Sequence, residues 1–135
     1  MTPCPLCAAP TEVVLWRDDR CRVIDVGDPA YPGYSRVIWN AHVREMSDLT
    51  ESERTHVMHV VYTVEQALRD LLQPEKINLA AFGNQVPHLH WHVIPRFSDD
   101  PHFPDAIWAV RRRDGKARAF ESAVLARELA KRLRR

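Results

Sequence analysis

The sequence predicts an α+β domain built on an antiparallel sheet of about five strands, with one central helix and one C-terminal helix. Short apolar or alternating segments are separated by turn residues, as in strands that are joined by short links. Two longer segments repeat apolar residues every three or four positions, which is the period of an amphipathic helix. The order is strands, helix, strands, helix, and this order favours antiparallel pairing in one α+β domain.

The expected strands are each bounded by turn residues. The first two flank a polar turn at residues 17–20 and form a plausible hairpin. Residues 27–34, with two prolines and two glycines, indicate a connection, and residues 1–11 are expected to be a loop. The strands are expected at residues 12–16, 21–26, 35–40, 76–82 and 87–95, with a further short candidate at 107–111.

The central helix has clear start and stop signals. Thr50 followed by Glu53 is a capping-box pattern, and Pro74 ends the helix. His56 and His59 fall off the apolar stripe, which predicts surface positions for both. The stripe consists of Val57, Val60, Val61, Val64, Leu68, Leu71 and Leu72.

The length of 135 residues suits a single domain over residues 1–135. The net charge is +1, but residues 111–135 hold ten Lys or Arg and three Asp or Glu, a local charge of +7. This basic segment contains the second expected helix, residues 117–134, and is either a solvated helix face or an attraction for phosphate-rich ligands. Few aromatic residues interleave with the charges, so we do not expect a nucleic-acid surface.

No run of about 18 apolar residues occurs, so no membrane-spanning helix is expected. The start, Met-Thr-Pro-Cys, lacks the basic and apolar stretches of a signal peptide, and we expect a cytoplasmic location. Three cysteines, an odd number, argue against a disulfide framework. Cys4 and Cys7 have the spacing of half a zinc site or of a redox pair, and Cys21 is expected to be a small buried hydrophobe.

Three histidines alternate with apolar residues in the strand expected at residues 87–95. Because the side-chain period of a strand is two, His88, His90 and His92 would share one face, with neighbouring imidazoles about 7 Å apart. This face could be an ordinary polar face, a metal site, or a nucleophilic site in which an imidazole attacks phosphorus. The spacing alone does not choose between metal binding and nucleophilic catalysis.

Residues 88–94, His-Leu-His-Trp-His-Val-Ile, resemble the pattern of the histidine triad (HIT) family, in which three histidines alternate with apolar residues. Upstream, residues 23–26 (Val-Ile-Asp-Val) are similar to the family's apolar-Asp-apolar strand end. Residues 37–42 (Val-Ile-Trp-Asn-Ala-His) are similar to its Val-Ile-Pro-Lys-x-His segment. The resemblance covers residues 4–96 and implies a HIT-like fold, in the branch of nucleotide hydrolases of which several act on dinucleoside polyphosphates.

The resemblance also implies roles for individual residues. His90 matches the nucleophile, which attacks the α-phosphate of a nucleotide and forms a nucleotidyl-histidine that water then cleaves. His92 matches the residue that hydrogen-bonds the phosphate oxygens or the leaving atom. Asp25 matches the carboxylate that holds the ribose hydroxyls, with strand-end capping as the alternative. Amide positions around the phosphate correspond to Asn78, Asn84 and Gln85.

Some branches of the superfamily bind a structural zinc ion, and the resemblance places its ligands at Cys4, Cys7, His42 and His88. Two cysteines and two histidines form a closed tetrahedral shell, so the metal would be structural and the chemistry would need no metal. The alternatives are a redox pair of the two cysteines and a metal-free network in which both histidines orient His90.

The function expected from these features is that of a nucleotide hydrolase or transferase. It would cleave at the α-phosphate of a dinucleoside polyphosphate or a nucleoside phosphoramidate. The alternatives are a non-catalytic module that binds a nucleotide or a partner, and a metal-dependent hydrolase that uses the histidine strand with His102. The resemblance further implies a homodimer.

Overall fold

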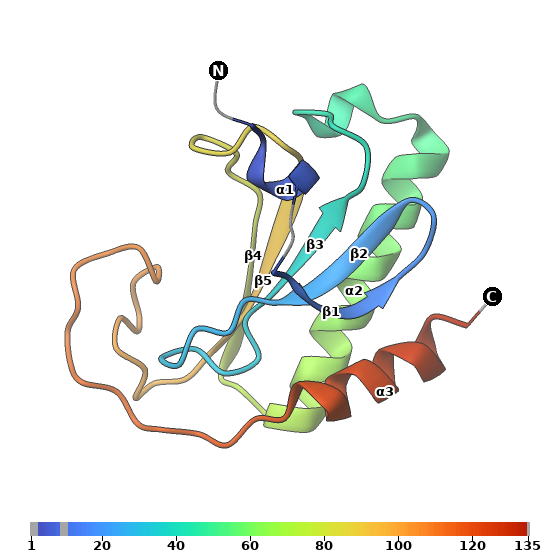
Figure 1. Ribbon diagram of the computed structural model, residues 1–135. Coiled ribbons are helices and arrows are strands. Elements are labelled where there is room, and N and C mark those ends of the chain that lie inside the picture. Colours follow the sequence, from blue (N-terminus) through green and yellow to red (C-terminus); the bar gives the residue numbers. More distant parts are fainter. Residues whose placement is uncertain (1–2, 9–10, 135) are drawn as a thin grey trace.

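A five-stranded antiparallel sheet forms the centre of the computed structural model, which describes residues 3–8 and 11–134. The expected loop at residues 1–11 therefore lies partly outside the described residues. The α+β class is confirmed, and the strand order is β1-β2-β3-β5-β4 (Figure 1). The strands are β1 (Val13–Arg17), β2 (Cys21–Asp25), β3 (Ser35–Trp39), β4 (Lys76–Ala80) and β5 (His90–Arg96).

Strand β5 is flanked on both sides, by β3 and by β4. His92 lies opposite Arg36 of β3 and opposite Ala80 of β4, and His90 lies opposite Ile38 of β3. Directly opposed residues of an antiparallel pair point to the same face. Both histidines of the strand therefore share one face of the sheet with Arg36.

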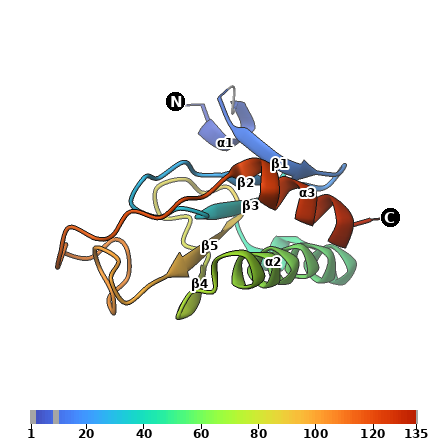
Figure 2. The same cartoon turned by 90° about the horizontal axis from the view of Figure 1, so that it is seen from below.

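Helix α2 (Glu51–Leu72) covers the other face (Figure 2). The Thr50 side chain accepts the backbone N–H of Glu53, and the Glu53 carboxylate accepts the N–H of Thr50. Gln73 ends the helix in the left-handed conformation, one residue before Pro74. The apolar stripe of α2 packs against the sheet, and this contact forms the main core. Its completely buried valines are Val23, Val37 and Val93 of the sheet and Val57, Val60, Val61 and Val64 of α2.

Helix α3 (Ser122–Arg132) packs against α2 and the edge strand β1. Its buried residues Leu125 and Leu129 join the main core. The helix starts at residue 122 and not at 117, because the preceding segment follows the loop: Arg118 pairs with Asp99, and its guanidinium carbon lies 3.7 Å from the ring centre of Phe97.

The face of the sheet opposite α2 is covered by irregular segments. Residues 26–34 bring Tyr31 and Tyr34 onto Ile94, which makes a small second core. The segment 97–121 has no helix or strand and extends away from the sheet (Figures 1 and 2). This segment and the N-terminal turn α1 (Pro5–Ala8) leave room over β3 and β5.

A 3-10 helix, η1 (Met46–Asp48), precedes α2. Two local predictions were wrong. Residues 5–8 form a helical turn instead of a loop. Residues 107–111 form no strand, and Trp108 and Val110 are 52% and 87% exposed. The apolar pattern there has another cause, because Trp108 lines a cavity. No described helix is long and apolar enough to cross a membrane.

Candidate active site and metal centre

A cavity of about 500 Å³ opens over β3 and β5, on the face opposite α2. His90 and His92 lie in its wall, together with Arg36 of the neighbouring strand. The N-terminal turn contributes Pro5 and Leu6. The remaining lining residues come from the loop after β4 and from the long C-terminal segment: Phe82, Gly83, Asn84, Gln85, Val86 and Trp108.

The imidazole of His90 is held in one orientation by the backbone. Its Nδ1 lies 2.6 Å from the carbonyl oxygen of His88, and because a carbonyl only accepts, Nδ1 carries the hydrogen. The other ring nitrogen, Nε2, therefore has a free lone pair. Burial lowers the pKa of His90, so the ring is neutral at neutral pH. A neutral, oriented imidazole beside a cavity has the properties of a nucleophile.

The imidazole of His92 is held by Tyr34, whose hydroxyl lies 2.7 Å from Nδ1. Tyr34 is buried, and its hydroxyl has no other acceptor among the described residues, so it donates to Nδ1 and leaves the hydrogen of His92 on Nε2. Burial, with the nearby His90 and Arg36, lowers the pKa of His92 to about 4. The two imidazole centres are 4.9 Å apart and not about 7 Å, because the rings meet edge to face.

The expectation that all three histidines share one face of a strand was wrong for His88. This residue precedes β5, which begins at His90, and it is completely buried. Its Nε2 lies 2.6 Å from the carbonyl oxygen of Trp39, so Nε2 carries the hydrogen and Nδ1 has the free lone pair. Burial lowers the pKa of His88 as well. The structure thus separates His88 from the other two histidines.

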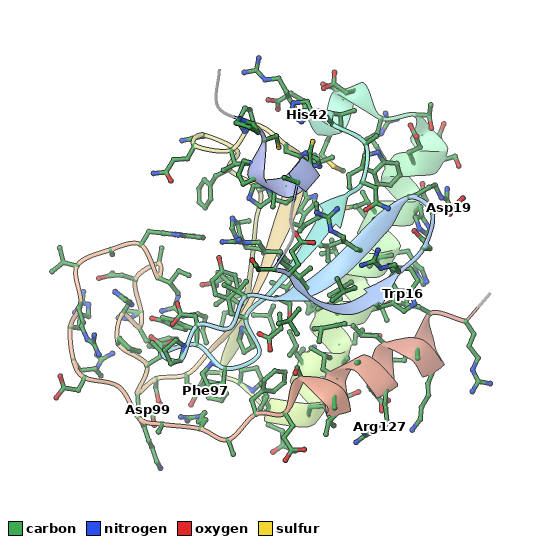
Figure 3. All side chains as sticks on the ribbon, viewed as in Figure 1. Trp16, Asp19, His42, Phe97, Asp99 and Arg127 are labelled. Atoms are coloured by element: carbon green, nitrogen blue, oxygen red, sulfur yellow. The ribbon has the colours of Figure 1, made fainter. Side chains whose placement is uncertain are left out.

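The free Nδ1 of His88 points to a cluster formed with Cys4, Cys7 and His42. It lies 3.4 and 3.5 Å from the two sulfur atoms and 3.3 Å from Nδ1 of His42, which is 3.4 Å from the Cys7 sulfur. Zinc bonds to nitrogen and sulfur give tetrahedron edges of about 3.3–3.8 Å. The four donors therefore fit one zinc ion. Figure 3 shows His42 at the end of the sheet where α1 lies.

The predicted substrate residues are not all at the cavity. Asn84 and Gln85 line it. Asp25 does not: it ends β2 opposite Ser35, one position after the residue that lies opposite Arg36, and its Oδ1 accepts the N–H of Gly27 at 2.9 Å. Asn78 does not line it either, because its amide oxygen accepts a hydrogen bond from Arg96 at 2.7 Å.

Several residues of the site were not predicted. The charged and aromatic ones are Tyr34, Arg36, Phe82 and Trp108. Arg36 had a detectable signal, a single charge inside an otherwise uncharged strand. The aromatic rings had none, because Phe82 and Trp108 come from different loops and meet edge to face only in the fold, with ring centres 4.9 Å apart. Trp108 also lies 5.2 Å from the imidazole of His92.

The segment that carries Trp108 is anchored by Asp100. This buried carboxylate accepts bonds from Arg96 at 2.8 and 3.1 Å and from the backbone N–H groups of Phe97, His102 and Phe103. Although burial alone would raise its pKa, these donors lower the pKa of Asp100 to about 2. The start of the long segment is thereby fixed to the end of β5.

Comparison with known families identifies the fold. Residues 9–99 match the family model of the HIT domain, which is more than half of the chain. The chain belongs to the HIT family. A histidine triad protein from Bradyrhizobium japonicum has the same fold, with a TM-score of 0.76 and 25% identity over 90% of this chain and 93% of that one. A histidine triad protein from Marinobacter aquaeolei gives a TM-score of 0.72 at 24% identity, covering 93% and 90% of the two chains.

Related HIT sequences include two that are named as nucleotide enzymes. An AP-4-A phosphorylase from Mycobacterium tuberculosis is 30% identical over 81 residues, which are 56% of this chain and 42% of that protein. An asymmetrical bis(5'-nucleosyl)-tetraphosphatase from Schizosaccharomyces pombe is 31% identical over 86 residues, 60% and 47% of the two chains. The match therefore spans less than half the length of either relative. Protein hit from Bacillus subtilis is 27% identical over 106 residues, covering 75% and 71%.

Proposed function

We propose that this HIT protein is a nucleotide hydrolase or transferase that cleaves at an α-phosphate through a covalent bond to His90. The observation that carries the proposal is the hydrogen bond from Nδ1 of His90 to the His88 carbonyl, which leaves Nε2 free in a cavity wall. The names of the two nucleotide enzymes make dinucleoside polyphosphates the first substrate class to test, and nucleoside phosphoramidates the second.

In the first step Nε2 of His90 forms a bond to the α-phosphorus, and the bond from phosphorus to the leaving oxygen or nitrogen breaks with its electron pair. The ring becomes positively charged, and the His88 carbonyl that accepts its Nδ1–H stabilises this charge. In the second step the oxygen of water attacks phosphorus, and the nitrogen–phosphorus electron pair returns to Nε2. Both protons of the attacking water are first carried by the product monophosphate, and its ionisation then releases one or both to solvent.

The neighbouring residues support charge movement at phosphorus. The hydrogen on Nε2 of His92 is available to a phosphate oxygen or to the leaving atom, since Tyr34 occupies Nδ1. The amides of Asn84 and Gln85 line the same cavity and supply further donors. Among the described hydrogen bonds of Asp25 only Oδ1 is used, which leaves Oδ2 for a ribose hydroxyl. The role predicted for Asn78 is indirect at most, because its oxygen is bound to Arg96.

We also propose one structural zinc ion held by Cys4, Cys7, His42 and His88. A bound zinc ion would tie the N-terminal turn α1 to the segment in front of β5. It would also fix the carbonyl of His88 that orients His90. With four protein ligands the ion would have no position open for a substrate. The chemistry at phosphorus therefore belongs to the histidines.

A homodimer is proposed as the assembly. Strand β4 is an edge of the sheet, and unpaired edges invite pairing with another chain. Tyr62 and Leu71 on α2 and Phe82 after β4 are large, exposed apolar residues. Light scattering on the eluting protein should give twice the mass of the chain, and a mass of one chain would exclude the dimer.

Turnover measurements test the proposed function. The wild-type protein should convert diadenosine tetraphosphate or an adenosine phosphoramidate to adenosine monophosphate, and His90→Asn should lower the rate by at least about 10⁴-fold. His59→Asn, at an exposed position on α2, is the matched control and should retain the wild-type rate. Binding of both substrates without product over long incubation would instead show a non-catalytic binding module.

A further inference from the structure

Arg36 is a cation in the cavity wall to which the proposed mechanism gives no role. It sits in the middle of the sheet, on β3, and lies opposite His92 of β5 on one side and Ile24 of β2 on the other. It lines the same cavity as His90 and His92. Any group bound at the two imidazoles is therefore within reach of its guanidinium.

The guanidinium carbon of Arg36 lies 5.7 Å from the ring centre of Tyr34, but pairing across the ladder does not account for its charge. A charged residue in a strand is usually balanced by an opposite charge across the ladder, but both partners of Arg36 are uncharged. No ion pair between described residues includes it. Its Nε is buried and has no hydrogen-bond partner in the described part of the chain. A buried, unmatched N–H is costly, so the Nε–H of Arg36 calls for a ligand that accepts it.

The charge balance of the cavity points to the chemistry of that ligand. None of the described residues that line the cavity is acidic, and Arg36 is the one lining residue with a permanent positive charge. His92 is uncharged at neutral pH, because its pKa is lowered to about 4. The cavity wall thus carries a single permanent positive charge, on a half-buried side chain whose Nε–H is buried and unpaired among the described residues. An anion with several acceptor oxygens satisfies both the charge and the donor.

We propose that Arg36 binds the phosphate group of the nucleotide that reacts at His90. The inference rests on the proposed function and adds a residue to it. The planar guanidinium can offer two parallel N–H groups to two phosphate oxygens. When His90 attacks, negative charge is spread over the oxygens around phosphorus, and a fixed positive charge beside them stabilises that arrangement more than the ground state.

Binding of a phosphorylated and an unphosphorylated nucleoside isolates the contact with phosphate. Titration of adenosine monophosphate and of adenosine, followed by calorimetry, should show at least about tenfold tighter binding of the monophosphate to the wild-type protein. Arg36→Met, which keeps most of the length without the charge, should abolish this preference, and Arg36→Lys should retain part of it. The control is Arg127→Met, an exposed position on α3 that should behave as wild type (Figure 3).

The rate of diadenosine tetraphosphate cleavage gives the second readout. Loss of one preorganised donor should lower kcat of Arg36→Met by about 100-fold, with the thermal midpoint unchanged. The inference is overturned if Arg36→Met keeps the tenfold preference for the monophosphate, or if the wild-type protein has none. A protein that binds monophosphate through Arg36 but shows no turnover would refute the proposed function and leave the inference intact. Undiminished turnover by Arg36→Met would overturn the inference and leave the proposed function intact.

Discussion

The Nδ1 atom of His90 lies 2.6 Å from the carbonyl oxygen of His88, and the side chain of His88 belongs to the cluster of two cysteines and two histidines. The backbone of one residue therefore orients the proposed nucleophile, while its side chain joins the proposed metal centre. A displacement of His88 would be felt directly at His90. Experiments that alter the proposed metal centre therefore also test the orientation of His90.

Removal of a cluster cysteine should release the metal and weaken the fold. The wild-type protein, prepared with zinc, should contain one zinc ion per chain, and Cys7→Ser should contain none. The loss of about 3 kcal/mol of stabilisation would lower Tm by roughly 10 °C. Elemental analysis and thermal unfolding measure both effects.

The matched control for this experiment is Cys21→Ala. Cys21 is completely buried outside the cluster, and its burial raises the pKa of the thiol to about 12. The variant should lose some stability but keep one zinc ion per chain. Absence of zinc from the wild-type protein would exclude the metal centre.

His92 should remain uncharged well below neutral pH. Its pKa is lowered to about 4, so protonation of His92 should not lower turnover near pH 6.5, the ordinary range of histidine, but only as the pH drops through about 4. The native ring resists protonation while the unfolded chain accepts a proton below about 6.5. This group therefore makes the protein less stable as the pH falls from about 6.5 to 4. A pH–rate profile with an acid limb near 6.5 would contradict the assignment.

Tyr34→Phe should reduce turnover without unfolding the protein. The variant loses the hydroxyl that fixes the ring of His92, a neutral hydrogen bond worth about 1 kcal/mol, and kcat should fall by roughly fivefold. Tyr62→Phe, at a residue of α2 that is 61% exposed, is the control and should be unchanged. Equal rates for the two variants would show that the Tyr34 hydroxyl has no role in turnover.

Asp100 should stabilise the fold above acidic pH. Its pKa is lowered to about 2, so its contribution is complete above the unfolded value near 4 and is lost as the pH falls toward 2. Asp100→Asn should cost about 3 kcal/mol, because it leaves Arg96 buried without its partner. Asp105→Asn breaks an exposed pair with Arg112, which water and salt screen, and should leave the free energy of unfolding close to that of the wild type. Urea unfolding of both variants tests the difference, and equal losses would contradict it.

His56 should contribute to stability, although its sequence position predicted a surface residue. Its Nε2 lies 2.6 Å from Oδ2 of Asp18, which ties α2 to the turn between β1 and β2. His56→Gln should lower the free energy of unfolding by about 1–2 kcal/mol. His59→Gln, at the exposed neighbouring histidine, should change it by less than about 0.5 kcal/mol. Denaturant titration distinguishes the two, and the account of His56 fails if both variants match the wild type.

The sequence predicts what depends on local pattern. The capping box at Thr50 and Glu53 and the alternation around His90 are local, and the structure contains both the helix start and the strand. The spacing of Cys4 and His88 in the sequence does not indicate that they lie close together in space. Their grouping came from the family resemblance. The structure places their donor atoms 3.4 Å apart.

The unpredicted part of the site depends on register and on loop paths. Arg36 enters the cavity because β3 pairs with β5 in a register that sets it opposite His92, and no local pattern encodes that pairing. Trp108 belongs to a segment read as a strand, because an apolar residue that lines a cavity looks the same in sequence as one that packs in a sheet. His56 appeared exposed because its partner Asp18 lies 38 positions away.

Direct detection of the covalent intermediate is the most decisive test of the account. The wild-type protein is mixed with diadenosine tetraphosphate or an adenosine phosphoramidate, quenched in base after milliseconds to seconds, digested and analysed by mass spectrometry. The account predicts an adenylyl group on His90, in the peptide that contains residues 88–94, and none in His90→Asn. Wild-type turnover with no nucleotide on any histidine, or a nucleotide on His92 in its place, would contradict it.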